Sequence, residues 1–248
     1  MDEKLIEKNR ELVERRLDKG LEIIKKRFEV EEIPIRDALN NFTLDGRTYS
    51  AFQYDIKEIG NMYYMKSTNK DDFMMDTMIF TPYYKHLPVF STDYLYMVDK
   101  RNVLHELYDL VDEEYITDTY KEYVKKFNDN LKRYDYVENK PPHNPWYEYL
   151  RSFYLAKLPT PEQDEDMYVA FEENMNLFLD MAEATPLIET KEEYEKKWKQ
   201  NKWYSDSLLE RAGIATQVFL DNVGQDFTDN FFEECFFAPG TYKDKFNN

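Results

Sequence analysis

The pattern of apolar and polar positions predicts a long amphipathic helix at the beginning of the chain. Within residues 2–28, apolar residues recur every three or four positions among dense charges, and this spacing gives a helix one buried stripe. Pro34 ends the segment, because proline does not continue a helix. The Asp45 and Gly46 pair that follows is typical of a tight turn.

Five segments after this turn predict successive strands of an antiparallel sheet. They are rich in Tyr, Phe, Met and β-branched residues, which favour strands, and short polar links such as 68–72 and 99–101 separate them. In order they read RTYSAFQYDI, IKEIGNMYYMKS, DFMMDTMIFTP, PVFSTDYLYMV and NVLHELYDL. A meander is the simplest way to connect such segments.

The second half of the chain is mostly helical in its pattern. A helical stretch at 113–139 is followed by a proline-rich break at 140–145 and a strand at 146–158. A helix of about six turns then begins near Pro161. The last elements are a mostly helical stretch at 190–223, with Gly224 as its cap, and a short helix or buried segment at 227–237. This order predicts an α+β fold, a three-layer α/β/α sandwich with a central antiparallel sheet flanked by helices, and a single domain over residues 1–248.

Composition and charge narrow the range of functions. The 248 residues include 42% hydrophobic ones, enough for a real core, and carry a net charge of −17. So negative a surface repels phosphate backbones and anionic lipid, which disfavours nucleic-acid and membrane-surface roles. The one cysteine, Cys235, excludes an internal disulfide framework and suits a reducing compartment. No apolar run approaches the roughly 20 residues of a spanning helix, and no signal-peptide core is seen, so we expect a cytoplasmic protein.

The common cofactor motifs are missing from the sequence. His86, His105 and His143 do not pair at metal-ligand spacing, and there is no H-E-x-x-H motif. The sequence also lacks G-x-G-x-x-G, Walker and G-x-S-x-G motifs. We therefore expect no metal site and no bound nucleotide.

Two carboxylates in neighbouring predicted strands are the first candidates for chemistry. If the hairpin is symmetric about Tyr84 and Lys85, Asp76 faces Asp93. Like charges opposite each other destabilise a strand pair, so such an arrangement calls for a functional reason. Burial and a neighbouring charge raise a carboxyl pKa, so that one acid stays protonated near neutral pH. Alternatively, both side chains point to solvent, or the register differs by one residue.

The sequence around these residues resembles the ferredoxin-dependent bilin reductases. In the run TMIFTPYYKHLPVFSTDYL, a strand that ends in an aromatic residue and a proline leads through a short loop to Leu87, Pro88, Phe90 and Asp93, which stand where the family pattern has them. The likeness covers most of the chain, including the meander before Asp76, the strand at 149–158 with the acidic helix after it, and the aromatic C-terminal segment.

The resemblance implies a fold, a reaction and partners. The fold would be an α/β/α sandwich that binds a linear tetrapyrrole such as biliverdin between the sheet and the C-terminal helices. The reaction would be reduction of this bilin to a phytobilin, with electrons taken one at a time from reduced ferredoxin or a flavodoxin-like donor, and with carboxylic acids protonating the bilin radical. Members of the family carry no metal or flavin, and we expect a monomer.

The resemblance also assigns roles to acidic residues. Asp93 matches the central aspartate of the family, which serves as proton donor. Asp76 occupies a position that holds histidine or asparagine in the family, and a carboxylate there takes over the proton work. The second aspartate of the family, on the C-terminal helices, falls on Gly213. Glu210, one helical turn earlier, and Asp206 are the substitutes, although both also fit the pattern of surface acids.

Aromatic and basic residues complete the expected substrate site. Stacking on the tetrapyrrole and binding of its propionates are assigned to aromatic and to cationic side chains, respectively. The aromatic candidates are Tyr64, Phe80, Phe90, Tyr94 and Trp146, and the cationic candidates are Lys85, Arg151 and Arg211. The alternative for the aromatic residues is ordinary core packing.

Charge sets a further condition on this interpretation. Ferredoxins are acidic, so a protein with a net charge of −17 needs a local basic patch to bind one rapidly. The candidates are residues 196–202 and the group Lys125, Lys126, Lys132 and Arg133, although each also fits the polar face of a helix. Two other functions stay open, namely a tetrapyrrole-binding protein without turnover and a reductase of an open-chain chlorophyll catabolite.

Overall fold

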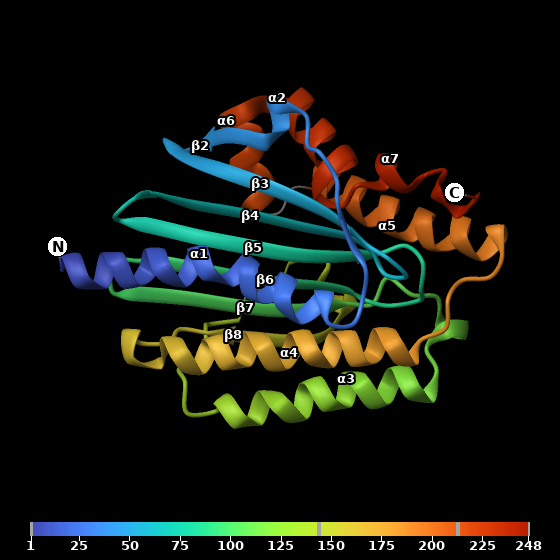
Figure 1. Cartoon of the computed structure of the whole chain (residues 1–248), viewed down its shortest axis with the longest axis horizontal. Helices are drawn as coiled ribbons and strands as arrows, with labels where there is room; N and C mark the ends of the chain where they lie inside the picture. The colour runs from blue at the N-terminus through green and yellow to red at the C-terminus, as the bar shows by residue number, and fades with distance from the viewer. Residues whose placement is uncertain (1, 143–144, 212–213, 248) are drawn as a thin grey trace.

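The computed structural model describes residues 2–142, 145–211 and 214–247, which form one antiparallel sheet with helices on both faces (Figure 1). The strands are β1 (Val30–Glu32), β2 (Asn41–Leu44), β3 (Arg47–Ile56), β4 (Gly60–Lys70), β5 (Phe73–Pro82), β6 (Val89–Met97), β7 (Lys100–Tyr108) and β8 (Arg151–Lys157). The helices are α1 (Glu3–Lys25), α2 (Asp37–Asn40), α3 (Asp118–Leu131), α4 (Asp164–Ala184), α5 (Lys191–Arg211), α6 (Ile214–Phe231) and α7 (Pro239–Tyr242).

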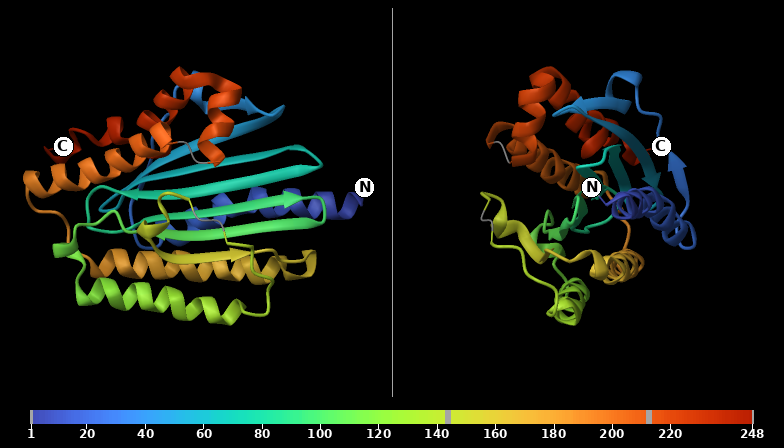
Figure 2. Two further views of the ribbon diagram at one scale, coloured as in Figure 1. Left: turned by 180° about the vertical axis from the view of Figure 1, so that it is seen from behind. Right: turned by 90° about the vertical axis from the view of Figure 1, so that its left-hand side faces the viewer.

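The sheet separates two layers of helices, as predicted. Strands lie in the order β1-β3-β4-β5-β6-β7-β8, and β2 pairs with β3 at the edge. Helices α1, α3 and α4 cover one face, and α5, α6 and α7 lie on the other (Figures 1 and 2). Each face has its own apolar core. The α+β sandwich with a central antiparallel sheet is therefore confirmed.

The N-terminal half follows the hydrophobic pattern closely. The predicted first helix is α1, and Asp2 caps it by accepting a hydrogen bond of 3.0 Å from the backbone N–H of Lys4. The five predicted strands are β3 to β7. The turn at Asp45 and Gly46 has positive φ at both residues, 51° and 69°, as a tight hairpin requires. The strands β1 and β2 were not expected, because each has only three or four residues.

The C-terminal half also agrees with the predicted order of elements. The strand expected from residue 146 begins later, as β8. The helix near Pro161 begins with a short 3-10 turn and continues as α4. At Gly224 the backbone leaves helical geometry with φ of 79°, so this glycine ends one helical segment inside α6. The final aromatic segment becomes a π-helical turn at Phe232–Phe236.

The register between β5 and β6 corrects one prediction. Thr77, not Asp76, lies opposite Asp93, and Asp76 lies opposite Tyr94. The pairing is centred on Lys85, because Phe80 pairs with Phe90, whereas the prediction placed the centre between positions 84 and 85. A shift of one residue moves a side chain to the other face of a sheet. The two aspartates therefore do not face each other.

Asp76 forms a fully buried ion pair on the face covered by α1. The Nε atom of Arg16 in α1 donates hydrogen bonds of 2.8 and 3.1 Å to the two carboxylate oxygens of Asp76. A second nitrogen of Arg16 donates to the hydroxyl of Tyr96 at 2.7 Å, and its guanidinium lies 3.4 Å from the ring centroid of Tyr94. These contacts fix α1 against the centre of the sheet.

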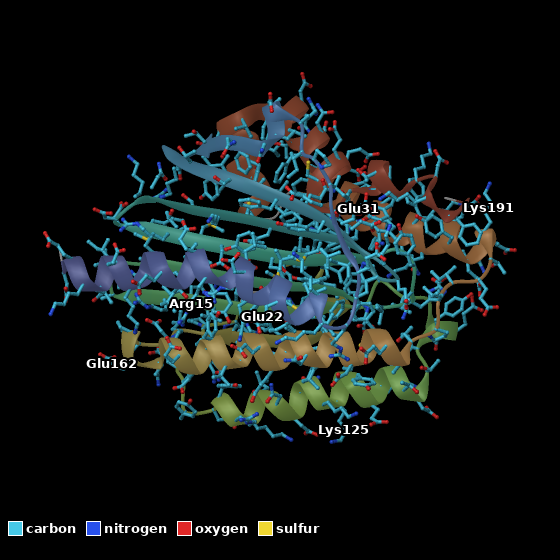
Figure 3. The ribbon with its side chains drawn as sticks, viewed as in Figure 1. Arg15, Glu22, Glu31, Lys125, Glu162 and Lys191 are labelled. Carbon is cyan, nitrogen blue, oxygen red and sulfur yellow. The ribbon has the colours of Figure 1, made fainter. Side chains whose placement is uncertain are left out.

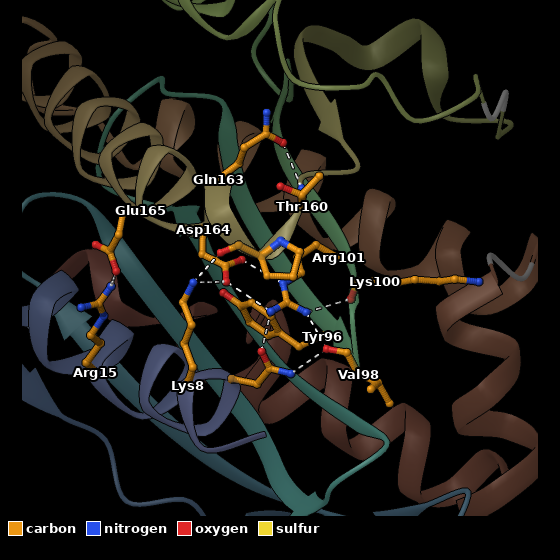
Figure 4. A network of polar contacts seen from close by, with 12 residues as sticks. Lys8, Arg15, Tyr96, Val98, Lys100, Arg101, Thr160, Gln163, Asp164 and Glu165 are labelled. Carbon is orange, nitrogen blue, oxygen red and sulfur yellow. Dashed lines mark hydrogen bonds and ion pairs between the residues drawn. The ribbon is translucent and has the colours of Figure 1, made fainter. Parts of the chain in front are cut away.

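A second buried ion pair joins α1, β7 and α4 near the β6–β7 turn (Figure 4). Arg101 of β7 donates to Asp164 of α4 at 2.9 and 3.2 Å, and Lys8 lies 3.0 Å from the same carboxylate. Asn9 of α1 accepts from Arg101 at 2.7 Å and donates to the carbonyl of Val98 at 3.0 Å. Val98 has φ of 55°, which is strained for a β-branched residue, so this network holds a strained turn in place.

Many other charged side chains lie on the outside of the molecule, as Arg15, Glu22 and Lys125 illustrate (Figure 3). Among the described residues, no helix is long and apolar enough to cross a membrane.

We expect the variant Asp76→Asn to lower the free energy of unfolding by about 3 to 5 kcal/mol, because it leaves the Arg16 charge buried without its carboxylate. The matched control is Glu165→Gln, which breaks the exposed ion pair between Glu165 and Arg15 and should cost less than about 1 kcal/mol. Urea unfolding of both variants measures the difference. Equal losses of unfolding free energy in the two variants would contradict the larger contribution expected from the buried ion pair.

Candidate functional site

Asp93 lies on the face of the sheet that the C-terminal helices cover, and this face is partly exposed around it. Along β5 to β7, side chains on the α1 face are buried throughout, whereas Met75, Asp93, Leu95 and Leu104 on the other face are only half-buried. Loop residues after α3 cross in front of these strands when the molecule is seen from behind (Figure 2). An accessible carboxyl thus sits on an apolar sheet surface.

Three polar residues on neighbouring strands surround Asp93. Thr77 of β5, directly opposite, donates its hydroxyl to the Asp93 carboxylate at 2.5 Å. Glu106 of β7 lies diagonally across from it, because Leu104 pairs with Asp93 and side chains two residues apart share a face. Arg151 of β8 forms an ion pair with Glu106 at 2.9 Å.

The surroundings of Asp93 favour its protonated form. Burial raises the pKa of Asp93 to about 7, the Thr77 hydroxyl acts in the opposite direction, and the charge of Glu106 adds to the rise. Burial also raises the pKa of Glu106, while Tyr108 and Arg151 oppose the rise. The two acids differ because, among the described residues, Glu106 forms an ion pair with Arg151, whereas Asp93 forms no ion pair and accepts from the Thr77 hydroxyl. Such a difference separates a proton donor from a fixed negative charge.

Aromatic side chains line this region and define what we call the aromatic wall: Tyr108, Trp146, Tyr147 and Tyr204. The ring centroids of Tyr147 lie 5.7 Å from Tyr108 and 5.3 Å from Trp146, and Tyr108 lies 5.5 Å from Tyr204 of α5. The guanidinium of Arg211 lies 4.6 Å from the ring centroid of Trp146. The indole Nε1 of Trp146 has no hydrogen-bond partner among the described residues, so it can donate to a ligand.

Several residues predicted for the substrate site lie elsewhere. The aromatic side chains predicted to stack on a ligand belong to the core on the α1 face, where ring contacts and hydrogen bonds fill their surroundings. These residues are Tyr64, Phe80, Phe90 and Tyr94. Asp76 lies on that face as well. The aromatic residues were predicted from their type, their position on strands and the family motif, none of which tells which face of the sheet is open.

Lys85 is also away from Asp93, because it binds the end of α4. Its Nζ atom donates to the carbonyl of Ala182 at 2.7 Å and lies 3.3 Å from the carboxylate of Glu58. Arg151 and Arg211, by contrast, lie on the same side as Asp93 through their contacts with Glu106 and Trp146.

The predicted substitutes for the second family aspartate line a different surface. Asp206 and Glu210 border a groove of about 550 Å³ between α5 and the C-terminal part of α6, and Asp206 accepts from Lys202 at 2.7 and 3.0 Å. The structure does not bring either residue together with Asp93. Gly213, the position to which the resemblance points, lies outside the described residues.

All but one of the basic residues expected to bind an acidic electron donor are engaged in ion pairs or buried; the exception is Lys199, which is exposed and forms no ion pair among the described residues. Lys197 is buried and donates to two backbone carbonyls. The other predicted cations pair with acids on the same or a neighbouring helix: Lys125 and Lys132 with Asp129, Lys126 with Glu122, Arg133 with Glu173, Lys196 with Glu114 and Glu192, and Lys202 with Asp206 and Glu233. These groups form no unneutralised basic patch.

Sequence reasoning missed Thr77, Glu106 and Tyr147. Thr77 required the correct register, and Glu106 required the knowledge that β7 pairs with β6 in the register that puts Glu106 beside Ser91. The signal for Glu106 was weak, because the predicted strand NVLHELYDL also contains Asn102, His105 and Asp109. Among the described residues, no group of His, Cys, Asp and Glu is placed to hold a metal ion.

Comparisons with known proteins support the fold. No protein-family model and no curated protein matches the sequence. Among solved structures, the chain is similar to the crystal structure of selenomethionine phytochromobilin synthase from tomato in complex with biliverdin. The TM-score is 0.73 at 13% sequence identity, over 92% of this chain and 83% of that chain. The chain therefore has the bilin reductase fold, as the sequence resemblance predicted.

We expect Asp93→Asn to stabilise the protein progressively as pH rises from about 4 to about 7, and by a constant amount above that. The pKa of Asp93 is about 7 in the folded protein and about 3.9 in an unfolded chain, so folding takes up a proton between these values. Stability contributed by this group is present at low pH and is lost as pH rises through that window. The difference of about 3 pKa units corresponds to about 4 kcal/mol, so the variant should exceed the wild type by up to about 4 kcal/mol at pH of about 8 and by no more than about 0.5 kcal/mol near pH 4.

Urea unfolding at the two pH values measures this difference. The matched control is Asp226→Asn, which makes the same charge change on the exposed surface of α6 and should alter stability by less than about 0.5 kcal/mol at both values. A stability gain for Asp93→Asn that is independent of pH would show that the carboxyl is ionised throughout.

Proposed function

We propose that this protein is a bilin reductase. It binds a biliverdin-type linear tetrapyrrole against the face of the sheet that the C-terminal helices cover, and reduces it with Asp93 as proton donor. One observation carries the proposal. In a fold shared with a biliverdin-complexed phytochromobilin synthase, the half-buried Asp93 has a pKa raised to about 7 on an apolar sheet surface beside aromatic side chains.

The chemistry of bilin reduction matches these groups. Reduction of one double bond consumes two electrons and two protons, and a radical forms if the electrons arrive singly. A carboxylic acid that is protonated near neutral pH supplies a proton at a fixed position. Trp146 and Tyr147, the half-buried members of the aromatic wall, offer flat apolar surface to the tetrapyrrole, and Arg151 and Arg211 provide positive charge for its propionates. We propose reduced ferredoxin, or a flavodoxin-like protein, as the electron donor.

Anaerobic absorption spectroscopy with biliverdin tests the proposal. We expect the protein to bind biliverdin with a shifted spectrum and, after addition of a reduced ferredoxin system, to form product bands at shorter wavelength. Asp93→Asn should bind biliverdin but slow product formation by about 100-fold or more, because loss of a positioned acid typically costs this much. Reduction should then stall at a radical that electron paramagnetic resonance detects.

The exposed variant Asp226→Asn is the matched control and should retain wild-type spectra and rates, since its side chain lies on the outside of α6. Binding of biliverdin without reduction by any low-potential donor would support a tetrapyrrole-binding protein instead. Absence of biliverdin binding, with binding of an open-chain chlorophyll catabolite, would favour that substrate class.

Salt dependence tests the electron donor separately. Because the chain carries a net charge of −17 and most of its candidate basic residues form ion pairs with acids, we expect an acidic ferredoxin to be repelled. Raising the salt from about 0.01 M to about 0.1 M shortens the Debye length from about 30 Å to about 10 Å. We therefore expect the second-order rate of electron transfer from ferredoxin to rise severalfold over this range.

Stopped-flow absorption measures this rate, and reduced methyl viologen, a small cationic mediator, is the control donor whose rate should fall over the same salt range. A ferredoxin rate that falls with salt would contradict the expected repulsion and would indicate a local basic docking surface.

A further inference from the structure

We propose that Glu106 and Arg151 form a charge pair whose negative member keeps Asp93 in its protonated, proton-donating form, which makes Glu106 a positioning residue of the site. This inference rests on the proposed function, in which Asp93 is the acid. The sequence pattern had suggested that Asp76 on β5 keeps Asp93 protonated. The inference assigns this role to Glu106 on β7 and Arg151 on β8.

The geometry of the sheet brings Glu106 beside Asp93. Leu104 of β7 pairs with Asp93, and Ser91 of β6 pairs with Glu106. Glu106 is therefore the diagonal neighbour of Asp93 on the same face, a position from which side chains of adjacent strands interact. The Glu106 side chain is only 9% exposed and that of Arg151 only 8%, so solvent screens the pair weakly.

The two carboxyls cannot share the site equally. Arg151 lies against Glu106, and its guanidinium also lies 4.2 Å from the ring centroid of Tyr154. The cation stabilises the ionised form of the acid that it contacts. The resulting negative charge then opposes ionisation of Asp93, which accepts a hydrogen bond from the neutral Thr77 hydroxyl. The pair thus holds one acid ionised and the other protonated.

Other charged and titratable groups around Asp93 come from each neighbouring element. Asp76, behind the strand, acts in the same direction as Glu106, and Lys140 acts in the opposite direction. The groups packed around this region are Thr77 and Asp76 of β5, Glu106 and Tyr108 of β7, Arg151 and Tyr154 of β8, Lys140 and Tyr147 before β8, and Tyr204 of α5. Glu106 is the acid among them that shares both the face and an adjacent strand with Asp93.

Infrared titration of the bilin-free protein tests the inference without any substrate. The C=O band of protonated Asp93 is assigned by subtraction of the Asp93→Asn spectrum and followed against pH. In Glu106→Gln the midpoint should fall by about one pH unit, because a neighbouring negative charge is lost. Glu106→Asp keeps the charge and should retain most of the wild-type midpoint.

In Arg151→Gln the expected shift of the midpoint has the opposite sign, so this variant keeps the test decisive if Glu106→Gln does not fold. Loss of the cation leaves the Glu106 charge without its partner, so the midpoint of the pair should rise. Glu138→Gln is the matched control, because it removes one exposed negative charge and should leave the midpoint unchanged. Circular dichroism verifies that each variant is folded.

The outcomes separate this inference from the proposed function. If the midpoint falls in Glu106→Gln and the pH above which bilin reduction slows falls with it, both are supported. If the midpoint shifts as expected but no bilin is reduced, the charge pair is supported and only the proposed function fails. If Asp93-dependent reduction proceeds while the Glu106→Gln midpoint stays unchanged or rises, or the Arg151→Gln midpoint falls, the inference is overturned and the function stands.

Discussion

Side chains of a strand alternate between the two faces of the sheet, and this alternation gives two nearby aspartates opposite surroundings. Asp76 points into the closed core under α1, where Arg16 neutralises it and joins the helix to the sheet. Asp93 points to the other face, where Thr77 is its opposite neighbour and no cation is in direct contact among the described residues. The first arrangement serves stability, because a buried charge must be paired. The second raises the pKa of an acid that solvent and a ligand can reach.

The two faces also divide stability from function at the level of packing. Under α1 and α4 the strands carry fully buried side chains such as Met78, Phe90 and His105, and the Arg101–Asp164 pair closes the end of that core. On the other face, Leu95 and Leu104 remain half-buried beside Asp93. Apolar surface left uncovered costs folding free energy, and so does an acid with a raised pKa at alkaline pH. Both free-energy costs arise on the face of the sheet where the proposed substrate binds.

Hydrophobic periodicity predicted most of the fold, because in a long segment many positions together indicate a helix or a strand. The register error shows that the same pattern does not define which individual residues pair across two strands. Moving the centre of the hairpin from Lys85 to half a residue earlier leaves every strand in place. It nevertheless puts Asp76 on the same face of the sheet as Asp93, whereas the two side chains lie on opposite faces. Composition also cannot tell which face of a two-sided sheet stays open, so it could not show that Tyr64 and Tyr94 lie in the core under α1. Asp93 was singled out first from the assumed hairpin symmetry and then from the motif around Leu87 and Pro88, and the motif needs no register.

Glu106 and Arg151 lie outside the reach of any local pattern. They come from neighbouring strands that are separated by more than forty residues, including α3, and only the pairing of β7 with β8 brings their side chains to one ion pair. The acid of the site therefore sits in a short motif, while the charges that set its protonation come from distant parts of the chain. Under the proposed function, substitutions in β7 or β8 would shift the pH at which Asp93 gives up its proton without altering the motif. Burial raises the pKa of Asp93 most, and the pairing of these strands adds the charge of Glu106 to that effect.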